Sequence, residues 1–506
     1  MMSLEHSKKV RSCEVLIVGA GPAGSTCATF LSSAGINCIL LDKETFPRDK
    51  PCGGGLTTRI FKRFDLNNEE VVDSVVRGGH LYGPDLKSSV KVDDNNNPVG
   101  YMVLRSSFDN YLVEKAKKFG STLIESQNIT EISFLQDKVL TKLENGEIIS
   151  SKIIIGADGV LGIVAKKSGL KERWKDDELG LCVFIEQALD AQVIKKYNPD
   201  NYSVHIHIEF KDLFGYFWLF YKKHHVNIGL GCLLSEKKKK KVNLKLAFLD
   251  YLKHLEETNL IPKLDISSLK LRGGLVPLKK PIEQTYGNRI LLLGDSAGFV
   301  NPLSGEGIYY AMSSGENAAK TIIQLKKQNK DYVKKNLKLY EKTWKNDFGG
   351  ELSKILFVRR FIMVSATINN LINYAKKDAA FRELIMKFML GMEEIQKRTL
   401  AKFFIKHVLK DLFRKFKQVM FLDVLLIVKL LNKFYSAIPS ILFGKKYKNF
   451  HRKFPLYLSN PEELSVSIQY SRKKTGKNSM YLVIEIIKQR IGNLLENFRL
   501  RINKKL

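Results

Sequence analysis

The chain has 506 residues, of which 44% are hydrophobic and 27% are charged. This length and composition exclude a mini-protein, a fibrous protein and a wholly disordered chain, and they fit a folded protein of two or three domains. Lys and Arg outnumber Asp and Glu by 83 to 52, for a net charge of +31, which favours an anionic partner such as nucleic acid, an anionic membrane or an anionic substrate.

Targeting and redox signals are sparse. The first 12 residues lack the apolar core of a signal peptide, and the apolar segment at residues 421–431 is interrupted by Asp423 and Lys429. The six cysteines include no Cys-x-x-Cys pair, so the sequence predicts neither a disulfide framework nor a structural metal site. We therefore expect a cytoplasmic protein that does not cross a bilayer.

A βαβ unit is predicted near the N-terminus. Residues 14–18 and 37–41 have the short, apolar, β-branched composition of strands, and residues 25–34 between them have the pattern of a helix. A glycine-rich turn joins the first strand to the helix. Such a unit is the usual framework of a dinucleotide-binding fold.

The glycine-rich turn carries the chemistry of this unit. Gly19, Gly21 and Gly24 form Gly-x-Gly-x-x-Gly, with Ala23 inside the motif, and Asp42 ends the second strand 18 residues after the third glycine. Gly19 would make the tight turn, Gly21 would let a pyrophosphate approach the backbone, and Gly24 would let the helix pack closely. Asp42 would accept hydrogen bonds from ribose hydroxyls. The alternative is a glycine turn that only packs.

Two later motifs indicate which dinucleotide is bound. Residues 152–159 are predicted to form a strand that runs into Gly-Ala-Asp-Gly, which contains Asp158, and residues 288–298 form another that runs into Gly-Asp-Ser-Ala-Gly, which contains Asp295. Together with the first motif, they resemble the three signatures of FAD enzymes of the p-hydroxybenzoate hydroxylase class. The resemblance implies that Asp295 binds the ribityl or ribose region and that Asp158 lies near the pyrophosphate. It favours FAD over NAD.

Residues 46–56 and 294–311 resemble the geranylgeranyl reductase family, which includes the digeranylgeranylglycerophospholipid reductases. Arg105 and Asp109 fit the family's Arg-x-x-Phe-Asp element, and the likeness covers about residues 13–330. The motifs and the resemblance together predict a cofactor site formed by Gly19, Gly21, Ala23, Gly24, Asp42, Cys52, Gly53, Gly55, Arg105, Ile129, Asp158, Asp295, Gly307 and Ile308.

A tight turn containing Pro302, Gly305 and Gly307 is predicted to open a helix over residues 308–325. The backbone N–H groups at the start of this helix would face an electron-rich atom. If that atom belongs to the N1/C2=O edge of a flavin, the helix dipole stabilises the anionic reduced form. The alternative is an ordinary Gly-Pro helix start.

An aromatic strand is predicted between the cofactor motifs. Period-two alternation places Tyr216, Trp218 and Phe220 on one face, which suits the wall of a cavity for a polyprenyl chain. The alternative is a plain aromatic core face. The segment resembles a family element but has Tyr221 where proline is usual. The strands expected in this region are residues 203–210, 215–221 and 227–233.

Cys52 is a candidate proton donor. In the family that the chain resembles, the corresponding cysteine lies beside the isoalloxazine, and reduction of an isolated alkene by hydride needs a proton on the other carbon. The alternative is that Cys52 is a small residue that lets the flavin approach. His205, His207, His224 and His225 have no carboxylate or third ligand at a recognised spacing, so no metal site is predicted there.

The resemblance and the strand pattern imply an α/β fold in three parts. A Rossmann-like FAD-binding domain, made of residues 10–60, 100–165 and 275–330, is interleaved with an antiparallel β-sheet substrate domain made of residues 61–99 and 166–274. A helical, basic C-terminal region would cover residues 331–506.

The C-terminal region has its own charge. Residues 401–506 contain 23 Lys and Arg against 6 Asp and Glu, and residues 401–418 show an apolar stripe opposite a Lys-rich face. Such a helix can lie on an anionic membrane. The alternative is a helix packed on the rest of the protein with a solvated Lys face. No nucleic-acid recognition module is visible.

These observations predict an FAD-dependent reductase of double bonds in prenyl chains of isoprenoid lipids, working as a peripheral protein at a cytoplasmic membrane face. A flavin-dependent hydroxylase or halogenase is the alternative within the same fold, and a prenyl-lipid carrier without catalysis is the alternative of another class. No second dinucleotide motif is present, so NAD(P)H and a ferredoxin-like carrier both stay open as electron donor.

Overall fold

The computed structural model describes residues 10–383, except 87–88, 94–96, 200–202, 212 and 363–364. These residues lie in one compact unit, Met1–Glu394. The predicted amphipathic stripe at 401–418 lies outside the described residues. In the part of the chain that is described, no helix has both the length and the hydropathy that a bilayer crossing requires.

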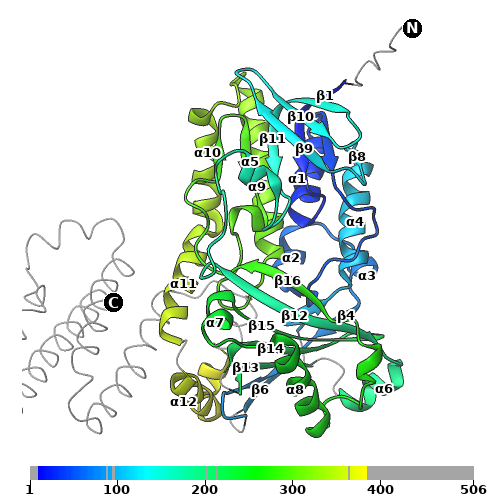
Figure 1. The fold of residues 1–506 in the computed structure, drawn as a ribbon, viewed down its shortest axis with the longest axis vertical. Coiled ribbons are helices and arrows are strands. Elements are labelled where there is room, and N and C mark those ends of the chain that lie inside the picture. The colour runs from blue at the N-terminus through cyan, green and yellow to red at the C-terminus, as the bar shows by residue number, and fades with distance from the viewer. Residues whose placement is uncertain are drawn as a thin grey trace, which may run out of the picture. The chain divides into compact units, whose positions relative to one another are not determined.

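A mainly parallel sheet forms the upper half of the view in Figure 1. Its central strand β1 pairs in parallel with β11 on one side and β2 on the other, and β8 and β18 extend these two sides in parallel. β2 and the second halves of β1 and β11 are apolar and buried, as parallel strands covered by helices are. In order, the path is β17 (Tyr286–Gly287), β18 (Ile290–Leu292), β11 (Ile148–Gly156), β1 (Val10–Val18), β2 (Cys38–Leu41) and β8 (Thr122–Ile124), and β10 (Val139–Leu143) and β9 (Ile129–Phe134) branch from β11.

The register of this sheet gathers the predicted motifs at one edge. Val18 lies opposite both Leu41 and Gly156, and Gly156 lies opposite Leu292. The carboxyl ends of four parallel strands are therefore level. Ligands bind beyond this edge in open α/β sheets, so the loops that follow these strands form one site.

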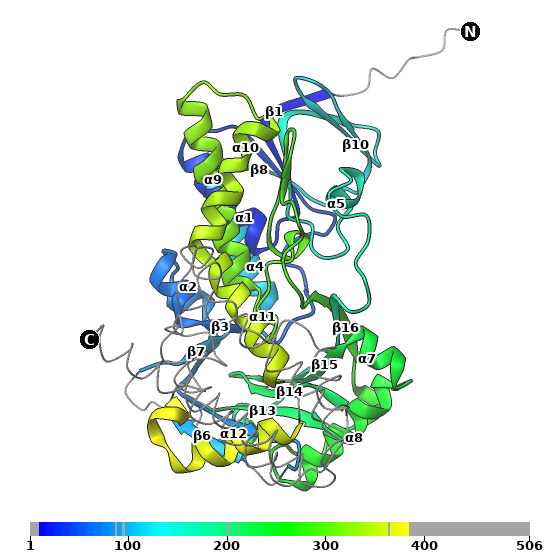
Figure 2. The ribbon, with the colours of Figure 1, turned by 90° about the vertical axis from the view of Figure 1, so that its left-hand side faces the viewer.

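Helices cover the parallel sheet and lie side by side in Figure 2. α1 packs against both α4 and α9, and α9 packs against α10. α1 begins at Pro22, three residues before the predicted start, because proline fits the first turn of a helix, where no N–H partner is needed. The helices are α1 (Pro22–Ser33), α4 (Arg105–Lys118), α5 (Ile163–Lys167), α9 (Ile308–Lys327) and α10 (Lys334–Trp344), with the 3-10 turn η2 (Gly294–Ala297) before α9.

An antiparallel sheet forms the lower half of the view in Figure 1. All its neighbouring strands pair antiparallel except β13 and β5, which pair in parallel. In order, they are β16 (Arg272–Pro277), β12 (Leu179–Ala188), β15 (His225–Leu233), β14 (Leu213–Tyr221), β13 (Ser203–Phe210), β5 (Gly78–Tyr82) and β6 (Ser89–Asp93). The associated helices are α6 (Ala191–Tyr197), α7 (Leu234–Lys239) and α8 (Leu244–Glu257), with the 3-10 turn η1 (Ile266–Ser268).

The alternation of β14 gives this sheet two different faces. Phe217 and Leu219 are fully buried and pack with Phe248 and Tyr251 of α8. The residues between them point to the opposite side. One face of the sheet is therefore a hydrophobic core, and the other is available to a ligand.

A small sheet and a run of helices complete the described chain. The small sheet follows the Cys52 loop and consists of β3 (Gly55–Thr57), β7 (Gly100–Met102) and β4 (Ser74–Val76), with helices α2 (Thr58–Arg63) and α3 (Asn68–Val71). After α10 come a π-helical turn, η3 (Lys345–Gly349), then α11 (Gly350–Ile362) and α12 (Ser365–Lys377). The predicted α/β class with a second, antiparallel sheet is confirmed, whereas the predicted domain boundaries stay a prediction.

Candidate active site

The glycine turn after β1 is shaped by close backbone contacts. Gly19 has a positive φ of 99°, and a Cβ on Gly24 would lie 1.9 Å from the Gly19 carbonyl oxygen. A Cβ on Gly21 would meet only the Arg48 Nη2, at 3.4 Å. Gly19 and Gly24 are therefore needed for packing, whereas Gly21 borders open space. That space is a cavity of about 860 Å³.

The cavity gathers almost every predicted cofactor residue. Gly24, which is packed inside the turn, is the exception, since it does not line the cavity. The aromatic residues Tyr216, Trp218 and Phe220 line the same cavity. The predicted cofactor residues that line it are Gly19, Gly21, Ala23, Asp42, Cys52, Gly53, Gly55, Arg105, Ile129, Asp158, Asp295, Gly307 and Ile308. That they bind a cofactor stays a prediction.

Two of the predicted aspartates also hold the backbone in place. Asp42 Oδ2 accepts from the Ala20 N–H at 2.7 Å, so this carboxylate supports the glycine turn. Asp158 Oδ2 accepts from the Val164 N–H at 2.9 Å, and its Oδ1 accepts from the Ser296 hydroxyl at 2.9 Å. Burial raises the pKa of Asp158, which these hydrogen bonds oppose. Asp158 thus connects the motif after β11 with the motif after β18.

Asp295 differs from these two aspartates. Its half-buried carboxylate lines the cavity, and its Oδ1 would lie 3.4 Å from a Cβ on Gly307. None of the described residues donates a hydrogen bond to it. Its acceptor positions are therefore open to a ligand, as binding of FAD hydroxyls requires.

A cluster of two arginines and one aspartate borders the glycine turn. Asp109 is fully buried, accepts from Arg105 through two hydrogen bonds of 2.8 Å, and lies 3.1 Å from Arg48. Arg48 Nη1 is buried and has no partner among the described groups. The cluster carries a net positive charge and an unused donor next to Gly21. These features fit an FAD pyrophosphate, and the sequence did not single out Arg48.

The Cys52 loop runs along the cavity. Cys52 is half-buried, its Sγ accepts from the Gly54 N–H at 3.4 Å, and it interacts with the Arg105 guanidinium. A Cβ on Gly53 would lie 2.9 Å from the Phe220 ring and 3.6 Å from Trp218 Nε1. The loop therefore touches the aromatic face that the alternation of β14 predicted.

A buried polar network ties this loop to the antiparallel sheet. Lys222 is only 2% exposed and forms an ion pair with Glu186. Asn227 donates from Nδ2 to the Cys52 carbonyl oxygen at 3.2 Å and accepts from Trp218 Nε1 at 2.7 Å. None of these three polar residues was predicted from the sequence. The one available signal was that period-two alternation places Lys222 on the same face as the aromatic residues.

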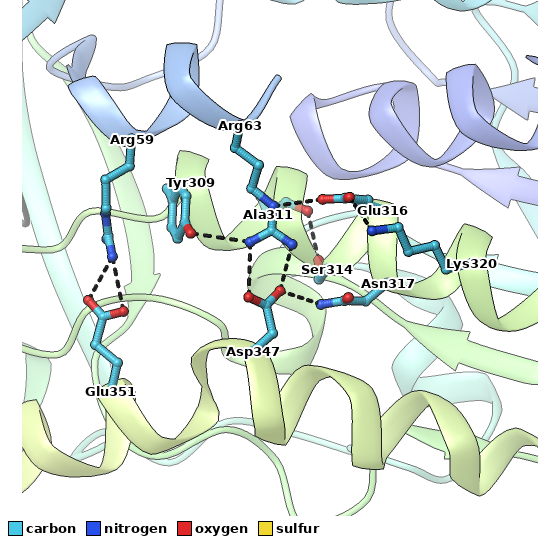
Figure 3. A network of polar contacts seen from close by, with 10 residues as sticks. All are labelled: Arg59, Arg63, Tyr309, Ala311, Ser314, Glu316, Asn317, Lys320, Asp347 and Glu351. Atoms are coloured by element: carbon cyan, nitrogen blue, oxygen red, sulfur yellow. Dashed lines mark hydrogen bonds and ion pairs between the residues drawn. The ribbon is translucent and has the colours of Figure 1, made fainter. Parts of the chain in front are cut away.

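Side chains of η3 and α11 hold α2, which follows the Cys52 loop and β3 (Figure 3). Arg59 Nη1 donates to both oxygens of Glu351 at 3.0 Å. Arg63 donates to both oxygens of Asp347 at 3.0 and 2.6 Å, and its Nε donates to Glu316 of α9 at 2.6 Å. Asp347 lies in the π-helical turn, a local feature that is frequent at functional sites.

The histidines of β13 are packed. His205 and His207 are 5% and 1% exposed, and burial is the main cause that lowers their pKa values to about 3 and about 2. The Nδ1 atom of His205 bonds to the Tyr82 hydroxyl at 2.9 Å, and that of His207 to the Tyr251 hydroxyl at 3.0 Å. Within the described ranges, no group of three His, Cys, Asp or Glu residues is placed to hold a metal ion.

Comparisons with known proteins agree with this geometry. A family model described as an FAD binding domain matches residues 12–341. The digeranylgeranylglycerophospholipid reductase of Methanocaldococcus jannaschii is 31% identical over 345 residues, which cover 66% of this chain and 82% of that protein.

Two solved structures share the fold. A geranylgeranyl bacteriochlorophyll reductase-like protein from Thermoplasma acidophilum has a TM-score of 0.63 at 24% identity, covering 72% of this chain and 91% of its own. A flavin-dependent brominase has a TM-score of 0.59 at 18% identity, covering 80% and 100%. The family match, the reductase relative and the FAD-compatible cavity lead to one conclusion: this chain is a flavoprotein of the FAD-binding family that includes the digeranylgeranylglycerophospholipid reductases.

Proposed function

We propose that this protein is an FAD-dependent reductase that saturates carbon–carbon double bonds in the geranylgeranyl chains of isoprenoid membrane lipids. The observation that carries the proposal is one continuous cavity, in which the cofactor motifs meet the aromatic face of Tyr216, Trp218 and Phe220 at the Cys52 loop. A prenyl chain is long and apolar. A wall of aromatic rings next to the loops that would hold the flavin suits it.

The chain's own residues have separate tasks in this proposal. Arg48 and Arg105 neutralise the pyrophosphate, and Asp295 accepts from hydroxyls of the cofactor. The aromatic rings hold the alkene and exclude water from it. Reduced FAD, when bound, supplies a hydride. α9 begins at Ile308, after Gly307, and the backbone N–H groups of its first turn would stabilise the negative charge of the reduced cofactor.

A flavin-dependent hydroxylase or halogenase is the second candidate, because a brominase shares the fold. The motifs around residues 46–56 and the 31% identity to a reductase support the reductase. A lipid carrier without a cofactor is the third candidate. The cofactor corner, which consists of the glycine turn after β1 and the loops with Asp158 and Asp295, is intact and argues against it. Peripheral attachment to an anionic membrane through residues 401–506, and an electron donor that is NAD(P)H or a ferredoxin-like carrier, belong to the same proposal.

Lipid mass spectrometry tests the proposed reaction. The protein is co-expressed with a pathway that makes digeranylgeranylglycerophospholipids, and a gain of two hydrogens for each saturated bond is expected. The Gly21→Val variant, in which the side chain blocks the pyrophosphate, is the matched control and should leave the lipid unsaturated. An added oxygen in the product would replace the reductase with a hydroxylase.

A further inference from the structure

Glu306 is a cavity-lining acid that the proposed function leaves without a role. It lies in the turn before α9, between two glycines, and lines the cavity together with Cys52 and Trp218. Its backbone is held on both sides, because its N–H donates to the Ser304 hydroxyl at 3.3 Å and its carbonyl oxygen accepts from the Asn301 N–H at 2.8 Å. The backbone of Glu306 is therefore fixed at the edge of the cavity.

The two oxygens of Glu306 have different environments. Oε1 accepts from the Tyr309 N–H at 2.8 Å, which caps the first turn of α9. Oε2 is buried and has no hydrogen-bond partner among the described residues. A buried carboxylate oxygen without a donor costs more free energy when it is charged than when it is protonated. The environment thus favours the acid form.

The positive charge that acts on Glu306, Arg59, is shared with a second carboxylate. Arg59 donates to both oxygens of Glu351, as Figure 3 shows, and so compensates that carboxylate first. Burial raises the pKa of Glu306 to about 7, although Arg59 opposes this rise, and the charge of Glu351 adds to it. Near neutral pH, a substantial share of the Glu306 side chains carries a proton.

We propose that Glu306 is the acid that protonates the alkene during reduction. The proposal rests on the function proposed above. The π bond of the alkene breaks as one carbon receives a hydride from reduced FAD and the other forms a C–H bond with the proton of Glu306 Oε2. Glu306 is left as a carboxylate, FAD is oxidised by two electrons, and water returns the proton. In this proposal, Cys52 only helps to position the Cys52 loop beside the cofactor.

The Glu306→Gln variant tests this role, because the amide oxygen can still accept from Tyr309 while the acid is lost. The protein is loaded with FAD, reduced with dithionite and mixed with a detergent-solubilised geranylgeranyl lipid, and flavin reoxidation is followed in the absence of oxygen. We expect Glu306→Gln to bind FAD and accept electrons normally but to reoxidise at least 100-fold more slowly. The wild-type rate should fall about tenfold per pH unit above pH 7, because only the protonated acid is competent.

Infrared titration of the protein without FAD gives a second readout. The C=O band of a protonated carboxylic acid should disappear as the pH rises through about 7 in the wild type, and this component should be missing in Glu306→Gln. Glu351→Gln is the matched variant. It frees Arg59 to stabilise the Glu306 carboxylate, so both the band and the rate profile should shift to lower pH.

The outcomes separate the two proposals. Reoxidation of Glu306→Gln at the wild-type rate and with the wild-type pH profile would overturn the role of Glu306 and leave the reductase standing. The role of Glu306 would also be overturned if the pH dependence of reoxidation disappeared in Cys52→Ala but persisted in Glu306→Gln. A wild type that binds FAD but never transfers hydride to the prenyl lipid would overturn the reductase, and the role of Glu306 with it.

Discussion

The two walls of the cavity are built on different principles. The cofactor corner consists of backbone: glycines that tolerate close contacts, strand ends that are level, and carboxylates that cap N–H groups. The opposite wall consists of side chains on β12, β13 and β14, where aromatic and aliphatic residues line the cavity. The Lys222–Glu186 ion pair supports this wall from within the sheet. A backbone-built site leaves a fixed pattern in the sequence, whereas a side-chain-built site depends on which strands become neighbours.

The largest expected effect comes from breaking the side-chain wall at Lys222. In Lys222→Met, the largely buried Glu186 carboxylate loses its counter-charge, which should lower the free energy of unfolding by about 3 kcal/mol or more. Chemical denaturation measures this loss. The double variant Lys222→Met/Glu186→Leu removes both charges and should recover most of it. A single variant as stable as the wild type would show that the ion pair contributes nothing.

The cofactor corner is tested by two glycines three residues apart. Gly24→Ala places a Cβ 1.9 Å from a backbone oxygen, and we expect a loss of about 3 kcal/mol in the free energy of unfolding. Gly21→Ala should cost little stability, since its Cβ meets only an arginine side chain. Thermal unfolding of the two apoproteins makes the comparison. Equal stabilities would contradict the assignment of Gly24 to packing and Gly21 to ligand approach.

Asp295→Ala removes an acceptor that only the ligand uses. FAD affinity should fall by about 1.5–3 kcal/mol, which corresponds to roughly 10- to 150-fold in Kd, because a hydrogen bond to a charged group is lost. Titration of the apoprotein with FAD, followed by flavin fluorescence, measures it. The melting temperature of the apoprotein should stay unchanged. Retention of wild-type affinity would remove Asp295 from the site.

The smallest effect concerns the core face of the antiparallel sheet. His205 and His207 are neutral in the fold because their pKa values are lowered, so the unfolded chain binds more protons below its pKa of about 6.5. Their stability contribution is complete above pH 6.5 and falls by about 1.4 kcal/mol per pH unit for each histidine below it. The His205→Gln/His207→Gln variant should show a flatter loss of stability between pH 6.5 and 5.5. An unchanged slope would contradict this linkage.

The sequence allowed prediction of the features that depend on a local pattern. The motif spacing correctly predicted a βαβ unit, and the strand predicted at residues 203–210 coincides with β13. Period-two alternation assigned Tyr216, Trp218 and Phe220 to one face, and the structure places all three on the cavity. These inferences succeeded because the periodicity of a strand and the conformational needs of a glycine turn are local properties.

The parts that escaped prediction are the long-range pairs. Lys222 and Glu186 are 36 residues apart in the chain, and Arg59 and Glu351 are 292 apart. Glu306 lies within a motif that was recognised for its glycines, and no role was predicted for its side chain. Burial and the pairing of Arg59 make Glu306 unusual, and both follow from tertiary packing that one sequence does not display.

The two arginine ion pairs of α2 determine how this helix aligns with its partner segment. Arg59 and Arg63 are one helical turn apart, and so are their partners Glu351 and Asp347, with the order reversed along the chain. If α2 slid by one turn along this partner segment, one of the two bidentate pairs would lose its mate. Only one alignment satisfies both. The two ion pairs thus fix the position of α2 along its partner segment, and with it the position of β3 and the Cys52 loop at the cavity.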